Sequence, residues 1–172
     1  MDASRRWINL PEGTRVLVEA PYGRLTGAAR TRRKVAFIAS GIGITPLRAL
    51  LEEMQHEPGQ GAVLLYRVSD MVDALFRKDT DDEKGLDTLA AERGVRVRYL
   101  IGHQGHGPHG PSWLPQGMQH FSDFHDLLRL IPDITNRDVY VCGPPEWMDA
   151  VERTARHAGV PDEQLHLERF AW

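Results

Sequence analysis

Hydrophobic residues fall into short continuous runs that alternate with longer segments of helical spacing. Such runs predict strands that are buried on both faces of a sheet. They cover residues 34–40, 62–68, 95–101, 138–142 and 164–170. Helical spacing of apolar residues is seen over 46–57, 122–131 and 144–158, and the polar segment 69–93 predicts two further short helices.

Strands that alternate with helices favour parallel pairing and right-handed crossovers. We therefore expect an α/β domain with a five-stranded parallel sheet and helices on both faces. The segment 102–121 is rich in Gly, Pro and His and predicts a long loop. Ligands of such sheets bind at the carboxyl ends of the strands. This rule selects the segments 40–46, 67–70, 101–112 and 142–147.

The first 27 residues do not follow this alternation. They contain one strand-like run at 14–20, a turn-like segment at 21–23, and the start of a basic connector. We interpret residues 1–27 as the tail of a preceding domain plus connector, and 28–172 as a separate α/β domain. An extra edge strand on the same sheet is the alternative interpretation of 14–20.

Composition narrows the function classes. The chain has 172 residues, 41% of them hydrophobic, and a net charge of −3, which suits one soluble domain and argues against nucleic acid as a partner. A single cysteine excludes an internal disulfide and a multi-cysteine metal site. We expect no metal at the histidines of the 102–121 segment and its flank, because Gly and Pro neighbours fix no tetrahedral frame. No membrane-length apolar run or secretory leader is present, which predicts a cytoplasmic location.

A glycine turn lies between the first predicted strand and the first predicted helix. Gly41 and Gly43 allow a ligand to approach the backbone closely, Thr45 is the expected N-cap, and Pro46 the expected first helical residue. The free N–H groups at a helix start suit a pyrophosphate. A tight structural turn without a ligand is the alternative.

The glycine turn, the sequence Val-Tyr-Val-Cys-Gly-Pro-Pro at 139–145 and the aromatic ending at 168–172 occur in an order that resembles the nucleotide-binding domain of the ferredoxin–NADP reductase superfamily. With Tyr66, Arg67 and the long loop, the chain looks most like its bacterial ferric-reductase-like branch, which is related to the NADPH oxidases. The resemblance implies NADPH or NADH in this domain and FAD in an adjoining flavin-binding β-barrel domain. In that branch a haem-bearing membrane domain often precedes the flavin domain, which would make this chain the cytoplasmic part of a membrane-bound reductase.

The resemblance also assigns roles to residues. The nucleotide would be held by Gly41, Ile42, Gly43, Ile44, Thr45 and Pro46 and by the turn Gly143, Pro144 and Pro145. Cys142 would lie beside the nicotinamide, and Glu168 would relay a proton or orient a ribose or flavin group. Phe170, with Trp172 sharing or replacing it, would cover the flavin ring. The alternatives are a small buried hydrophobe at Cys142, a solvated carboxylate at Glu168 and plain apolar anchors at the two aromatics.

Arg67 follows the second predicted strand, whose tip meets the adenosine ribose in dinucleotide folds. An arginine there accommodates a 2′-phosphate and favours NADPH. Arg77 is a second candidate for the same phosphate. The alternative is a surface arginine that pairs with Asp70 or Asp73.

Together these features predict part of a flavin-dependent reductase. The domain would pass hydride from NAD(P)H, with NADPH favoured, to the flavin, and electrons would continue to haem, ferric iron or another acceptor. The alternative function is a nucleotide-sensing or interaction module that kept the fold without the chemistry. A self-contained dehydrogenase is disfavoured, because no substrate domain is present.

Overall fold

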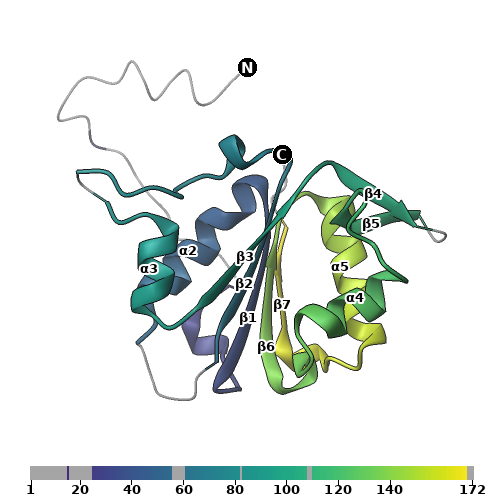
Figure 1. The fold of residues 1–172 in the computed structure, drawn as a ribbon. Coiled ribbons are helices and arrows are strands. Elements are labelled where there is room, and N and C mark those ends of the chain that lie inside the picture. Colours follow the sequence, from purple (N-terminus) through teal and green to yellow (C-terminus); the bar gives the residue numbers. More distant parts are fainter. Residues whose placement is uncertain (1–14, 16–24, 56–60, 82, 108–109, 170–172) are drawn as a thin grey trace.

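A five-stranded parallel sheet forms the centre of the molecule, with strand order β3-β2-β1-β6-β7 (Figure 1). The structure is a computed structural model that describes residues 15, 25–55, 61–81, 83–107 and 110–169. The strands are β1 (Lys34–Ser40), β2 (Val63–Val68), β3 (Arg96–Ile101), β6 (Arg137–Cys142) and β7 (Leu165–Glu168). The predicted sheet is confirmed, and its strands lie within about two residues of the expected ranges.

Helices cover both faces of the sheet, as predicted (Figure 1). On one side lie α2 (Ile44–Glu53) and α3 (Leu86–Glu92), and on the other lie α4 (Asp123–Leu130) and α5 (Pro145–His157). Short 3₁₀ turns connect the larger elements: η1 (Gly27–Ala29), η2 (Gly41–Gly43), η3 (Met71–Asp73), η4 (Ile134–Asn136) and η5 (Asp162–Gln164). The first of the two helices expected within 69–93 is only the 3₁₀ turn η3.

Two hydrophobic cores lie on opposite faces of the sheet. In β1 the side chains alternate, so that Val35 and Phe37 join the core beneath α2 and α3 while Ala36 and Ile38 join the core beneath α4 and α5. This double burial is the physical reason for the continuous apolar runs. The edge strand β3 differs, because Arg96 and Arg98 are exposed between partly buried neighbours.

The segment expected to be a long loop contains an antiparallel hairpin instead. Its strands are β4 (Gln104–Gly107) and β5 (Gly110–Pro115). Trp113 and Leu114 of β5 are fully buried in the core beneath α5. The Gly and Pro content concealed these strands, because an isolated two-stranded ribbon tolerates residues that a central strand does not.

Candidate functional site

The glycine turn has the backbone shape that a phosphate-binding turn needs. Gly41 has a positive φ of 55°, and a Cβ built on it would meet no atom within 4 Å. The Tyr66 hydroxyl donates to the Gly41 carbonyl over 3.1 Å and accepts from the Leu75 backbone N–H over 3.2 Å. The turn is therefore held from below by a buried side chain and faces open space above.

The start of α2 differs from the prediction. The helix begins at Ile44, so the N-cap is Gly43 rather than Thr45, and Pro46 is the third helical residue rather than the first. The 3₁₀ turn η2 feeds directly into the helix and moves its start forward. Pro46 still fits, since the N–H groups of the first turn have no helical partner. No side chain caps this end of α2, and the Ile44 N–H donates to the Gly41 and Ile42 carbonyls within η2.

The two glycine motifs, which lie about a hundred residues apart in the sequence, are in contact. A Cβ on Gly43 would lie 2.7 Å from the Gly143 backbone nitrogen and closer still to the Cys142 carbonyl group. A Cβ on Gly143 would lie 2.7 Å from the Trp147 ring and 3.1 Å from the Ser40 Cβ. The ends of β1 and β6 therefore meet at a spacing that only glycine permits on both strands.

Arg67 is buried at the same edge of the sheet. Its side chain has only 9% relative exposure, and Nη1 donates to the Ser40 hydroxyl over 3.1 Å. Among the described residues no carboxylate pairs with it, and the buried Nε has no hydrogen-bond partner. Burial lowers the pKa of the guanidinium. The interpretation as a surface arginine paired with Asp70 or Asp73 is therefore wrong.

Cys142 and Glu168 are opposite each other in the pairing of β6 with β7. Cys142 is fully buried and Glu168 is partly buried. Burial, followed by the Glu168 charge, raises the pKa of the Cys142 thiol to about 12. The thiol is therefore neutral, which suits a small apolar contact and not a nucleophile.

The burial of Cys142 predicts an unreactive thiol. At about pH 8 we expect negligible labelling of the native chain by a maleimide, and complete labelling once the chain is unfolded, because only the thiolate attacks. Because the pKa is raised from 9.0 to about 12, the stability gained from this burial is complete below 9 and is lost as the pH rises toward 12. Mass spectrometry after timed labelling measures the labelled fraction of the native and the unfolded chain, with Ala28→Cys as an exposed control. Rapid labelling of native Cys142 would contradict the packing.

Trp147, two residues beyond the Pro144–Pro145 turn, is a core residue. It is fully buried, and its Nε1 donates to the Trp113 carbonyl over 2.7 Å. Pro145 begins α5, as expected of a proline at the first helical position. Phe170 and Trp172, predicted to cover the flavin ring, lie outside the described residues, as do residues 16–23 of the predicted tail of a preceding domain.

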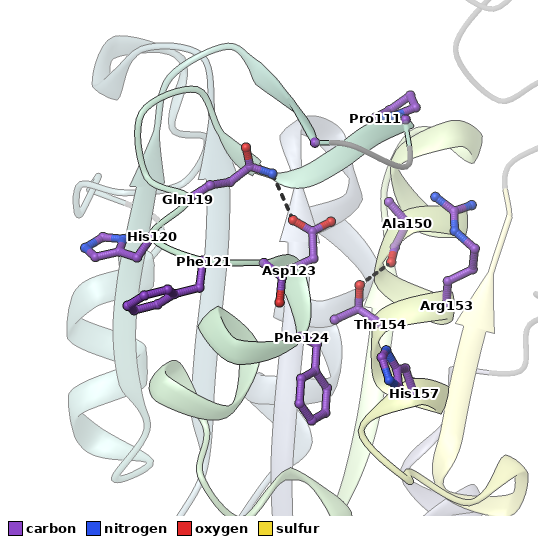
Figure 2. A pocket seen from close by; sticks show the side chains of 13 residues that line it. Pro111, Gln119, His120, Phe121, Asp123, Phe124, Ala150, Arg153, Thr154 and His157 are labelled. Carbon is purple, nitrogen blue, oxygen red and sulfur yellow. Dashed lines mark hydrogen bonds between the residues drawn. The ribbon is translucent and has the colours of Figure 1, made fainter.

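A pocket of about 320 Å³ lies elsewhere, between the hairpin, α4 and α5 (Figure 2). Asp123 lies in its wall and accepts from the Gln119 amide over 3.0 Å, and Thr154 donates to the Ala150 carbonyl over 2.8 Å. None of the predicted nucleotide-binding residues lines it. The histidines nearby do not converge, and among the described residues no group of three His, Cys, Asp or Glu side chains is arranged to hold a metal.

Sequence reasoning missed two residues of this edge. Tyr66 was noted as part of a motif, but its role as the support of the Gly41 carbonyl follows only from the fold. Ser40 links Arg67 to the Gly143 turn. A polar residue at the last position of a buried strand is the one signal in the sequence that points to such a contact.

Comparison with known proteins places this edge in a family context. The profile of the oxidoreductase NAD-binding domain matches residues 37–153. A flavohemoprotein from Oceanobacillus iheyensis is 22% identical over 160 residues, which cover 92% of this chain and 36% of that protein. The ferredoxin–NAD(+) reductase component of an alkene monooxygenase system from Xanthobacter autotrophicus is 27% identical over 159 residues, which cover 92% of this chain and 45% of that protein.

Among solved structures, the flavohem-like FAD/NAD binding domain of a nitric oxide dioxygenase from Vibrio cholerae is similar, with a TM-score of 0.59 and 25% identity. The match covers 82% of this chain and 52% of that one. The chain thus spans less than half the length of the curated relatives described above. The predicted ferric-reductase-like branch is not confirmed by these matches.

Proposed function

The chain belongs to the oxidoreductase NAD-binding domain family, and from this premise we propose that it binds NADPH or NADH and presents the nicotinamide to a flavin held by an adjoining domain. The observation that carries the proposal is the contact between the two glycine motifs, which places an uncapped helix start, open space above Gly41 and an unpaired buried arginine at one edge of the sheet. Each of these features favours an anionic ligand.

Different residues of this edge contact different parts of the dinucleotide. The N–H groups at the start of α2 face the pyrophosphate, while Tyr66 fixes the turn that precedes them. Exposed apolar side chains at Val72, in the turn η3 that follows β2, and at Ile101, the last residue of β3, provide surface for the adenine base. Cys142 and Glu168 end neighbouring strands, where the nicotinamide half would lie.

When bound, the nicotinamide supplies a hydride to the flavin. The part played by this chain is positioning, because hydride transfer needs the reacting atoms at about 3–3.5 Å. The small, neutral Cys142 leaves room for the two rings to meet. We infer from the family that the electrons continue to haem, iron or another acceptor. The described residues contain no helix of the length and apolarity that crossing a membrane requires. The haem-bearing membrane domain therefore stays a prediction from the resemblance.

We propose that Arg67 favours NADPH by contacting the 2′-phosphate. In Arg67→Ala we expect the affinity for NADPH and 2′-AMP to fall about tenfold to a hundredfold, because a charge-assisted hydrogen bond contributes about 1.5–3 kcal/mol. NADH affinity should stay unchanged. Calorimetric titration of the three ligands measures this.

Arg77→Ala tests the second candidate for the 2′-phosphate, and it should lower NADPH affinity less than Arg67→Ala, because the partly exposed Arg77 Nε lies 3.8 Å from the Asp87 carboxylate. An equal loss of affinity for NADH and NADPH in Arg67→Ala would mean that Arg67 contacts the pyrophosphate and not the 2′-phosphate. Wild-type chain that binds none of the ligands would favour the sensing or interaction module instead.

A further inference from the structure

A fully buried carboxylate lies outside the nucleotide site. Asp138, near the start of β6, has no exposed surface. It accepts hydrogen bonds from the Thr31 backbone N–H over 2.8 Å, from the Thr31 hydroxyl over 3.2 Å and from the Arg32 backbone N–H. The fourth contact is His166 Nε2 of β7, 2.9 Å away. Three of the four donors therefore belong to the connector, which we define as residues 25–33.

Neighbouring side chains hold the same connector. The ring of Tyr140 stacks on His166 at 4.4 Å, and its hydroxyl donates to the Thr26 carbonyl over 3.2 Å. Arg32 Nε donates to the Gln164 side chain over 2.7 Å. The connector is therefore fixed to β6, β7 and η5 at two places, Thr26 and the pair 31–32.

A buried carboxylate costs several kcal/mol unless hydrogen bonds replace its water. Here three of the four contacts come from the connector and one, His166, comes from the sheet. The Arg32 side chain directs its Nε to Gln164. A core position at Asp138 needs no carboxylate, since the neighbouring β6 positions of the same face are Tyr140 and Cys142. The hydrogen bonds that it accepts from the connector explain why a carboxylate stands at position 138.

The connector also shapes a surface. Thr26 and Ala29 line an open hollow of about 960 Å³ together with β7 and Arg169, the residue that follows it. The hollow extends along β7 to Glu168, which pairs with Cys142 at the carboxyl edge. The path of the connector therefore determines what can approach this edge from the side of β7.

We propose that Asp138 is a positioning residue that fixes the connector, and with it the direction in which the chain before residue 25 leaves the domain. For its catalytic consequence this rests on the proposed function. A flavin domain joined through this connector would meet the Cys142–Glu168 edge at a set distance, and hydride transfer is sensitive to shifts of about 1 Å. The anchoring itself does not depend on nucleotide binding.

Asp138→Asn tests the anchor in the full chain. The amide keeps the shape but loses the charge and one acceptor oxygen. We expect the Thr31 and Arg32 amides to exchange hydrogen at least about tenfold faster, while amides of β1 and β2 keep their protection. Asp133→Asn is the matched control, because that carboxylate binds Lys34 and Arg137, which both lie outside the connector.

A second readout separates position from stability. Nitroxide labels on Ala28→Cys and Arg153→Cys, both exposed, report the distance between the connector and α5, and the buried Cys142 stays unlabelled. Asp138→Asn should broaden this distance distribution, with the affinity for NADPH unchanged. If Asp138→Asn does not fold, Thr31→Val and Tyr140→Phe each release one contact of the connector and should broaden it to a smaller degree.

Unchanged exchange at residues 31 and 32 together with an unchanged distance distribution, in a folded Asp138→Asn or in both substitutes, overturns the anchor. Because neither readout uses a nucleotide, a wild-type chain that binds no dinucleotide would remove the proposed function and leave the anchor standing. Conversely, if Asp138→Asn binds NADPH normally but hydrogen exchange and the label distance at the connector do not change, the anchor is overturned and the proposed function stands.

Discussion

Gly43→Ala is expected to destabilise the fold by about 3 kcal/mol and to lower the affinity for NADPH and NADH together, by more than tenfold. The added Cβ would collide with the backbone of Cys142 and Gly143, and neither wall can move as a flexible side chain would. The ends of β1 and β6 would have to separate, which displaces the turn that faces the pyrophosphate. Chemical denaturation and calorimetric titration of the same variant measure both effects.

Gly41→Ala is the control for this variant. A Cβ at Gly41 meets no atom within 4 Å, so its only cost is the positive φ of 55°, about 1–2 kcal/mol for an L-residue. The fold should therefore lose less stability than in Gly43→Ala. If Gly43→Ala were as stable as wild type and bound nucleotide normally, the close contact of the two motifs would be refuted.

Trp147→Ala is expected to lower the free energy of unfolding by about 3–5 kcal/mol. The indole is fully buried beneath the sheet, and its loss leaves a cavity and a Trp113 carbonyl without its donor. The same ring forms the wall against which Gly143 packs, so nucleotide affinity should fall as well. Urea denaturation monitored by circular dichroism gives the stability.

Trp147→Phe separates packing from hydrogen bonding. It keeps an aromatic ring in the core but removes the Nε1 donor and part of the indole volume, so a loss of about 1–3 kcal/mol is expected, smaller than that of Trp147→Ala. A loss as large as that of Trp147→Ala would mean that the contact with Trp113, and therefore the hairpin, carries most of the stabilisation. A loss near zero in both variants would contradict the buried position of the indole.

The sheet could be predicted from the sequence because its central strands are buried on both faces and read as continuous apolar runs. β1 was placed at its observed bounds for this reason. The hairpin could not be predicted, because Gly105, Gly110 and Pro111 carry no strand signal. Its stability depends on Trp113 and Leu114 packing beneath α5, a contact distant in the sequence.

The candidate site also contains some residues that could be predicted from the sequence and others that could not. Gly41, Gly43, Cys142 and Gly143 could be selected from motifs, and the fold brings all four to one edge. The burial of Arg67 could not be foreseen, because its partner Ser40 lies on the neighbouring strand and 27 positions away in the chain. The predicted N-cap at Thr45 failed because the glycine turn is itself a 3₁₀ turn that continues into α2.

The exposed arginines of β3 have a consequence for self-association. Among the described residues β3 is the last strand on one side of the sheet, and an edge strand of this kind can pair with a strand of another molecule. Arg96 and Arg98 stand along this border, and two copies meeting edge to edge would bring like charges together without water between them. At physiological salt such repulsion acts over about 8 Å, which is longer than the spacing of about 4.8 Å between paired strands. The edge strand with the weakest hydrophobic pattern thus carries charges that disfavour its pairing with a second copy.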